Sequence, residues 1–167
     1  MSTTTPTKTE TPSGLDARAA VRVLEEGYGP GAWHGPDLRA ALEDVADDDA
    51  FRRPAPGRHS IAEIALHHAF CVRAVREKIT GRPAEPFALA GEDWFALEAG
   101  RPLSWEQARA ALASEQARLA EALTDIAAGR ATSPLPDGER FDLALGVTCH
   151  AVYHAGQVQL LKRLQQG

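Results

Sequence analysis

The chain has 167 residues, of which 44% are hydrophobic and 25% are charged, enough for one soluble globular domain with a substantial core. Eighteen basic and 23 acidic residues give a net charge of −5. Because both signs are scattered along the sequence, the balance argues against a nucleic-acid-binding surface, which needs a clustered basic face. No run of about 18 apolar residues is present, so the sequence predicts no transmembrane helix and no membrane partner.

The first segment, residues 1–14, reads MSTTTPTKTETPSG and has no apolar stretch of the kind found in a secretory signal. We expect a disordered tail there and a single domain over residues 15–167, with a cytoplasmic location as the default. Cys71 and Cys149 fall within helical patterns and do not form a C-x-x-C pair. We therefore expect both to be small buried thiols in a reducing compartment.

Helical periodicity dominates the domain, and strand patterns are absent. The pattern predicts helices over about 15–26, closed by Gly27 and Gly29, then 36–46 with Pro36 at the first helical position, 60–80, 104–128 and 141–165. The acidic stretch after the second helix is expected to belong to a connection.

Two helix starts carry a capping box, in which a serine is followed three residues later by a glutamate or glutamine. Ser60 with Glu63 opens one helix, and Ser104 with Gln107 opens the next. Between them lies a segment rich in proline and glycine, residues 82–103, which is too long for a tight helical hairpin. Four principal helices with one long crossover connection predict an all-α four-helix bundle.

The last helix has polar groups on the face that should be apolar. Steps of four and three residues, which keep to one face, meet Leu143, Val147, His150, His154, Gln157, Leu161 and Leu164. Two histidines four residues apart lie one turn apart and are close enough to share a metal ion. The alternative is a polar network in the core, in which each ring needs hydrogen-bond partners. Ala151 follows His150, so the zincin pattern H-E-x-x-H is not present.

A third metal ligand would come from the helix over 60–80, which holds His67 and His68. Helical phase places His68 on the apolar stripe and His67 at its edge. Each helix of a bundle touches two neighbours, so both positions could face inward, and periodicity leaves the choice open. His59, at the start of this helix, is expected to be solvated or to act as a cap.

The segments HSIAEIALHHAFCVRAVREKITG, HAVYHAGQVQLLKR and AWHGPDLRAAL resemble the DinB-like family of damage-inducible, YfiT-type helical bundles. The most specific part is H-x-x-x-H-x-G-Q in the last helix, matched by His150, His154, Gly156 and Gln157. The resemblance implies a third metal ligand seven residues after the serine that starts its helix, which is His67. The next position is usually apolar in the family, and His68 departs from that pattern.

The resemblance implies a divalent ion, zinc, nickel or iron, held by His67, His150 and His154 with at least one open coordination position. Members of the family resemble thiol transferases, in which a small thiol such as bacillithiol or mycothiol is activated on the metal and attacks a small electrophile. A metal-dependent hydrolase and a non-catalytic, stress-related metal-binding bundle are the alternatives. A homodimer is also left open.

Three further groups keep two interpretations each. Gln157 either orients a ligand or a water, or packs as an amide beside a close helix approach at Gly156. Trp33 and His34 either line the mouth of a pocket or form a helix-entry turn. Glu63 lies one turn before His67 and could serve as a base, although its capping role already accounts for it.

Overall fold

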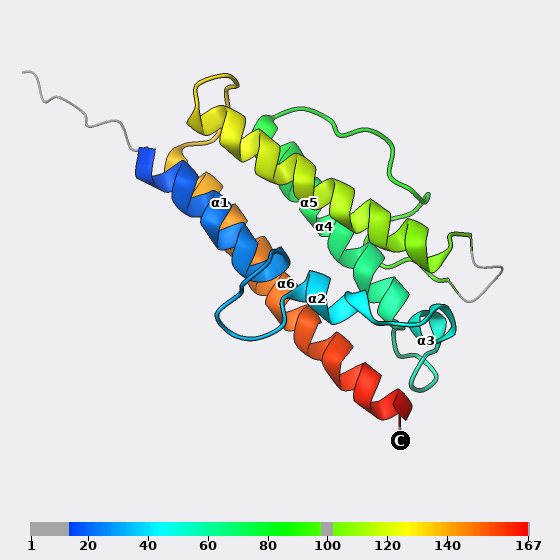
Figure 1. Ribbon diagram of the computed structural model, residues 1–167. Helices are drawn as coiled ribbons and strands as arrows, with labels where there is room; N and C mark the ends of the chain where they lie inside the picture. Colours follow the sequence, from blue (N-terminus) through cyan, green and yellow to red (C-terminus); the bar gives the residue numbers. More distant parts are fainter. Residues whose placement is uncertain (1–13, 98–101, 167) are drawn as a thin grey trace, which may run out of the picture.

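The structure, a computed structural model, describes residues 14–97 and 102–166. These ranges contain six helices and no strand: α1 Gly14–Tyr28, α2 Leu38–Glu43, α3 Asp47–Phe51, α4 Ile61–Thr80, α5 Trp105–Ala127 and α6 Asp137–Gln166 (Figure 1). The all-α prediction is confirmed. The expected tail lies outside the described residues except for Gly14, the first residue of α1. No helix in the described ranges is both long enough and apolar enough to cross a membrane.

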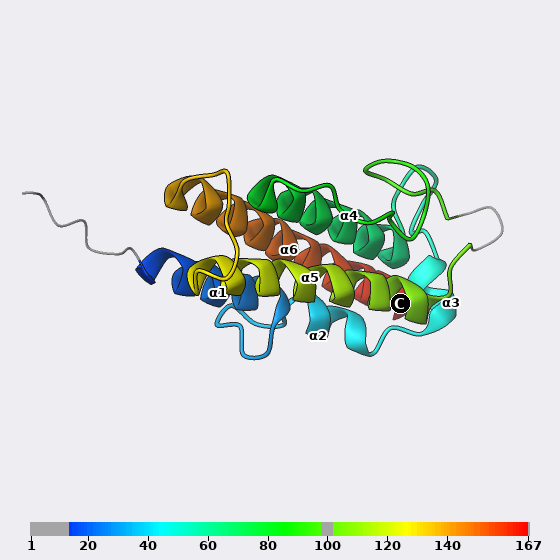
Figure 2. The same cartoon turned by 90° about the horizontal axis from the view of Figure 1, so that it is seen from above.

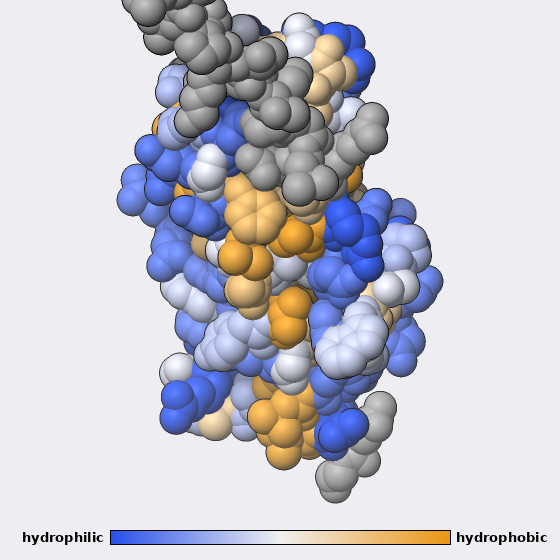
Figure 3. All heavy atoms as spheres, turned by 90° about the vertical axis from the view of Figure 1, so that its left-hand side faces the viewer, coloured by the Kyte–Doolittle hydropathy of each residue, from blue (hydrophilic) through white to orange (hydrophobic). Residues whose placement is uncertain are grey.

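The four long helices form a bundle in which each has two neighbours. α1 packs on α5 and α6, and α4 packs on the same two helices from the other side. α1 and α6 run in one direction, and α4 and α5 run in the opposite direction (Figures 1 and 2). The short helices lie beside this frame, α2 against α6 and α3 against α4. On the side of the molecule that lies to the left in Figure 1, apolar side chains form a broken strip between hydrophilic flanks (Figure 3).

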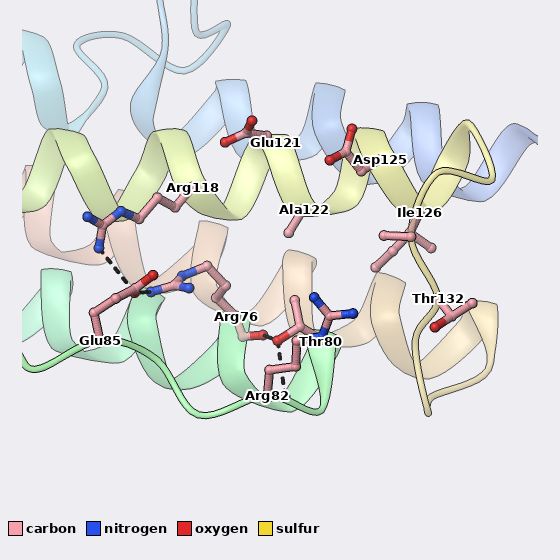
Figure 4. A pocket seen from close by; sticks show the side chains of 11 residues that line it. Arg76, Thr80, Arg82, Glu85, Arg118, Glu121, Ala122, Asp125, Ile126 and Thr132 are labelled. Carbon is pink, nitrogen blue, oxygen red and sulfur yellow. Dashed lines mark hydrogen bonds and ion pairs between the residues drawn. The ribbon is translucent and has the colours of Figure 1, made fainter.

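The parallel course of α4 and α5 requires the connection between them to return along the bundle, as Figure 1 shows. Its first part is fixed by arginines. Arg73 of α4 donates to the backbone carbonyl of Glu85 at 2.8 and 3.0 Å. Arg76 of α4 and Arg118 of α5 donate to the Glu85 carboxylate at 2.9 and 3.3 Å (Figure 4). The expected crossover connection is therefore present and is held against both helices that it joins.

Both predicted capping boxes are present. The Ser60 hydroxyl accepts from the backbone N–H of Glu63 at 3.3 Å, and the Glu63 carboxylate accepts from the backbone N–H of Ser60 at 2.9 Å. Ser104 and Gln107 make the same exchange at the start of α5. Gly81 ends α4 with φ +65°, a left-handed conformation that glycine adopts without strain. Local hydrogen bonding thus sets the ends of α4, the helix that carries His67 and His68.

Other predicted boundaries were wrong. α2 begins after Asp37, whose side chain caps the helix by accepting from the N–H of Ala40, so Pro36 lies outside it. The acidic stretch expected to be a connection forms α3, because carboxylates in a first turn are favoured by the helix dipole. The same effect explains why α6 begins at Asp137 and not at 141. A capping or acidic residue, more than apolar periodicity, decides where each of these helices starts.

α1 and α6 approach each other closely at Gly27, whereas the sequence suggested a close helix approach at Gly156. Gly27 does not end α1 but lies within it, and a Cβ atom there would stand 2.9 Å from the Cβ of Ala151 on α6. Gly156, by contrast, has open space around it. Cys149 is exposed and Cys71 is only partly buried, so the expectation of two buried thiols was wrong for Cys149. It is Gly27 that lets α1 and α6 pack tightly beside the histidine-bearing turns.

We predict that Gly27→Ala destabilises the fold although alanine favours a helix by about 1 kcal/mol. The added methyl group would overpack the α1–α6 contact, which typically costs about 1–3 kcal/mol. Gly146→Ala on α6, where nothing stands near an added Cβ, is the matched control and should gain about 0.5–1 kcal/mol. Urea denaturation measures both, and equal stabilisation by the two changes would contradict the close contact.

Candidate metal centre

Four imidazoles meet where α4 packs against α6. His67 and His68 come from the middle of α4, and His150 and His154 lie one turn apart on α6. Their side chains are withdrawn from solvent: His68 is 0% exposed, His154 2% and His67 7%, while His150 is partly buried. Such a concentration of titratable rings in a core requires that each ring has partners.

Three of the rings point their Nε2 atoms at one another. The Nε2 atom of His150 lies 3.2 Å from that of His67 and 2.8 Å from that of His154. Ligand atoms of these three residues all lie within 4.8 Å of one another, so the group could hold one metal ion. The rings of His150 and His154 are turned by 80° and 86° to that of His67, so neither ring is stacked on it. This arrangement directs three Nε2 atoms to one place.

The opposite nitrogens of two of these rings are held by oxygen atoms. The Nδ1–H of His154 donates to Oε1 of Gln157 at 2.6 Å, and the amide nitrogen of Gln157 donates to the Tyr153 hydroxyl at 3.0 Å. The Nδ1 atom of His67 lies 3.1 Å from the carbonyl and 2.9 Å from the carboxylate of Asp93. Because these oxygens accept, each ring carries a proton on Nδ1, and in the neutral form of either ring Nε2 is the nitrogen without a proton. Metal-binding histidines are commonly oriented in this way.

Asp93 and Trp94 belong to the crossover connection. Asp93 has φ +61°, an uncommon conformation that aspartate tolerates better than most residues, and both of its oxygen-bearing groups reach His67. The Trp94 ring stacks on His67 at 3.9 Å and on His59 at 3.6 Å between ring centroids. The sequence did not predict either residue as part of the site, because a connecting segment has no periodicity that indicates its contacts. The only signal was an aromatic residue in a segment rich in proline and glycine.

His68 contacts the other side of His150. Their Nδ1 atoms lie 3.1 Å apart, and the Nε2 atom of His68 lies 3.1 Å from the side-chain nitrogen of Gln116 on α5. His67 and His68 therefore both face inward, since α4 has α5 and α6 as neighbours. The converging set contains His67, and His68 lies behind His150.

Burial favours the neutral form of three of the rings, those of His68, His150 and His154. It lowers the pKa of His154 to about 4, although the hydrogen bond to Gln157 acts in the opposite direction. It also lowers the pKa of His150, where the nearby His67 adds to the effect, and it lowers the pKa of His68 well below the usual value. Neutral imidazoles have a lone pair to give to a cation.

A second group could also hold an ion. Ligand atoms of His67, Cys71 and Asp93 lie within 4.8 Å of one another, and the Cys71 sulfur is 3.9 Å from Nε2 of His67. Burial raises the pKa of the Cys71 thiol to about 11, so the thiol is protonated at neutral pH. Binding of an ion through Cys71 would therefore require the loss of this proton, whereas a neutral imidazole coordinates an ion without a net loss of protons.

A cavity of about 670 Å³ lies beside the histidines. It is lined by Pro54, Ala55, Arg58, His59, Ile64, Trp94, Tyr153, His154, Gln157, Leu160, Leu161 and Leu164. The cavity thus has a polar end at His154 and Gln157 and an aliphatic wall from α6. Leu164, which the sequence placed on the buried face, is 61% exposed and belongs to this wall.

A second cavity, of about 340 Å³, lies between α4 and α5 away from the histidines (Figure 4). It is lined mainly by charged side chains, and among them Arg76 and Arg118 are already paired with Glu85. These three side chains hold the first part of the crossover connection, as described above.

Other expected site residues lie elsewhere. Trp33 is 93% exposed, and the His34 ring donates to the backbone carbonyl of Glu26 at 2.8 Å, so this segment is a turn after α1 and not a pocket mouth. Glu63 accepts from the backbone of Ser60 and of Leu97 and pairs with Arg53. Its carboxylate is fully engaged and is not aimed at the histidines as a base.

The sequence matches the DinB superfamily over residues 32–158. No curated protein and no solved structure matches it at a significant level. The matched region takes in α4, the crossover connection and most of α6, and therefore all four histidines that meet between α4 and α6. Since the match spans well over half of a chain that folds as a helical bundle, this protein belongs to the DinB superfamily.

Proposed function

We propose that the protein is a metal-dependent thiol transferase. In this proposal His67, His150 and His154 hold one divalent ion, and a small thiol of the bacillithiol or mycothiol type is transferred to a small electrophile. The observation that carries it is that the converging rings are not sealed in the core, because His154 also lines the 670 Å³ cavity. An ion that served only to join helices would need no such space.

The chemistry of the three ligands agrees with this function. Neutral imidazoles do not compensate the charge of a divalent ion, and three of them leave room for a further ligand. When bound, such an ion lowers the pKa of a coordinated thiol and so makes the thiolate available at neutral pH. A separate base is then unnecessary, which fits the engagement of Glu63 with its cap and with Arg53.

The protein's own groups would prepare the site for both reactants. Gln157 and Asp93 hold the protons of His154 and His67 on the far side of each ring. The leucine wall of the cavity offers an apolar surface for the body of the electrophile and limits the water at the reacting end. Arg58, at the lining, favours reactants that carry a negative charge.

The first prediction concerns metal and stability. The wild type should bind about one equivalent of zinc, and its melting temperature should fall after EDTA treatment, because a ligand that binds only the folded state stabilises it. His154→Ala should bind little metal and show no response to EDTA, while His34→Ala, a histidine change outside the site, should behave as wild type. Elemental analysis and calorimetry measure both, and an unchanged melt after verified metal removal would count against the site.

A second prediction separates the two possible ligand groups. At about pH 8 an imidazole is ordinarily neutral, so the three histidines themselves should release close to zero protons on binding zinc. A water molecule in the open position can release a proton too, but that release does not depend on Cys71. Coordination of Cys71, with its pKa raised to about 11, would release about one. Titration calorimetry in two buffers of different ionisation enthalpy counts the protons. A release near one, lost in Cys71→Ser, would favour the group that contains Cys71.

The third prediction concerns activity. Zinc-loaded protein should accelerate conjugation of bacillithiol or mycothiol to a small electrophile, measured as loss of free thiol. His154→Ala should fall to the uncatalysed rate with its helical content retained, since alanine is a good helix former. Equal rates for wild type and His154→Ala with every thiol tried would remove the transferase and leave hydrolysis or a non-catalytic role.

A further inference from the structure

A continuous line of hydrogen bonds crosses the buried histidines from α5 to the cavity. It passes through Gln116, His68, His150, His154, Gln157 and Tyr153, with successive separations of 3.1, 3.1, 2.8, 2.6 and 3.0 Å. The side-chain nitrogen of Gln116 faces His68 and can only donate. His68, His150 and His154 then each accept a hydrogen bond at the ring nitrogen nearer α5 and donate one from the ring nitrogen nearer the cavity. Every neutral ring in the line is satisfied in this direction.

This direction is incompatible with a metal ion on the three Nε2 atoms. It places the proton of His68 on Nδ1 and the proton of His150 on Nε2, from which it is donated to His154. His67 and His154 already present bare Nε2 atoms, because their Nδ1 atoms face oxygens. His150 is therefore the ring whose proton has to change position before three lone pairs converge.

We propose that His68 and Gln116 are positioning residues that set the tautomer of His150. When an ion binds, the Gln116 amide turns so that its oxygen faces His68, which reverses the first half of the line. His150 then donates from Nδ1 to His68, and His68 donates from Nε2 to Gln116. Each ring keeps one proton, so neither gains charge, and the Nε2 atom of His150 is left bare.

The cost of burying this pair supports a role for it. His68 is fully buried and Gln116 is buried beside it. Burying these polar groups costs the free energy of their hydration, a cost that apolar side chains at the same positions would not have. Neither belongs to the converging group of three. A half-turn of the amide exchanges its oxygen and nitrogen without moving the side chain, so the reversal needs no rearrangement of the helices. The inference rests on the metal-binding part of the proposed function.

The test compares zinc affinities by competition with a chromophoric chelator. Gln116→Met keeps the length of the side chain but removes the acceptor, and His68→Phe keeps a ring but removes both nitrogens. Each should weaken zinc binding by about 10- to 100-fold, as loss of a group that orients a ligand typically does. Gln116→Glu, which retains an acceptor toward His68, should bind zinc at least as tightly as wild type. Thr148→Val removes a buried hydroxyl outside the line and is the matched control.

A spectroscopic readout separates positioning from mere packing. In protein with ¹⁵N-labelled histidine, the His68 proton should be on Nδ1 without metal and on Nε2 with zinc. Any one of three results would overturn the inference. The first is a His68 tautomer that does not change with zinc, and the second is wild-type zinc affinity in both His68→Phe and Gln116→Met. The third is a Gln116→Glu protein that binds zinc as weakly as Gln116→Met. Failure of the wild type to bind zinc would overturn the metal site as well. Loss of thiol transfer alone, with zinc binding and the tautomer change intact, would leave this inference standing.

Discussion

Burial of neutral imidazoles between α4 and α6 is the constraint on which the rest of the site depends. A buried ring nitrogen without a partner costs about 1–3 kcal/mol, and four rings meet here. Three elements provide hydrogen-bond partners for the ring nitrogens: Asp93 comes from the crossover connection, Gln116 from α5 and Gln157 from α6. Polar groups that look scattered in the sequence are therefore one network, and the fold has to bring three separate elements to it.

The crossover connection is central to that arrangement. A short turn after α4 would make α5 antiparallel to it and would leave the His67 side of the interface open. The long return path instead carries Asp93 and Trp94 back over His67, where the tryptophan covers the ring face and the aspartate binds its edge. Arg73, Arg76 and Arg118 fix the start of this path at the other end of the helices. The same segment thus determines both the topology and one wall of the site.

The sequence was most informative where local rules operate. Capping boxes located the starts of α4 and α5, and the four-residue spacing correctly placed His150 and His154 on one inward face. The extents of α2 and α6 were missed because periodicity outweighed the capping and acidic residues at their starts. Asp93, Trp94 and Gln116 could not be foreseen, since their roles depend on which segments meet in space. Periodicity also could not choose between His67 and His68, because a helix with two neighbours buries two faces.

The pairing of α4 with α6 has a consequence for how the site comes into being. His67 and His150 contact each other across 83 residues of chain. Contacts between residues so far apart in the sequence form late, because the long loop between them must first close, which lowers the entropy of the chain. During synthesis α4 and α5 can associate while the histidines of α6 are still missing, and a nascent chain at that stage exposes His67 and His68 with no ring opposite them. Capture of a metal ion by His67, His150 and His154 would therefore require a completed bundle, and occupancy by the ion would distinguish finished molecules from partly folded ones.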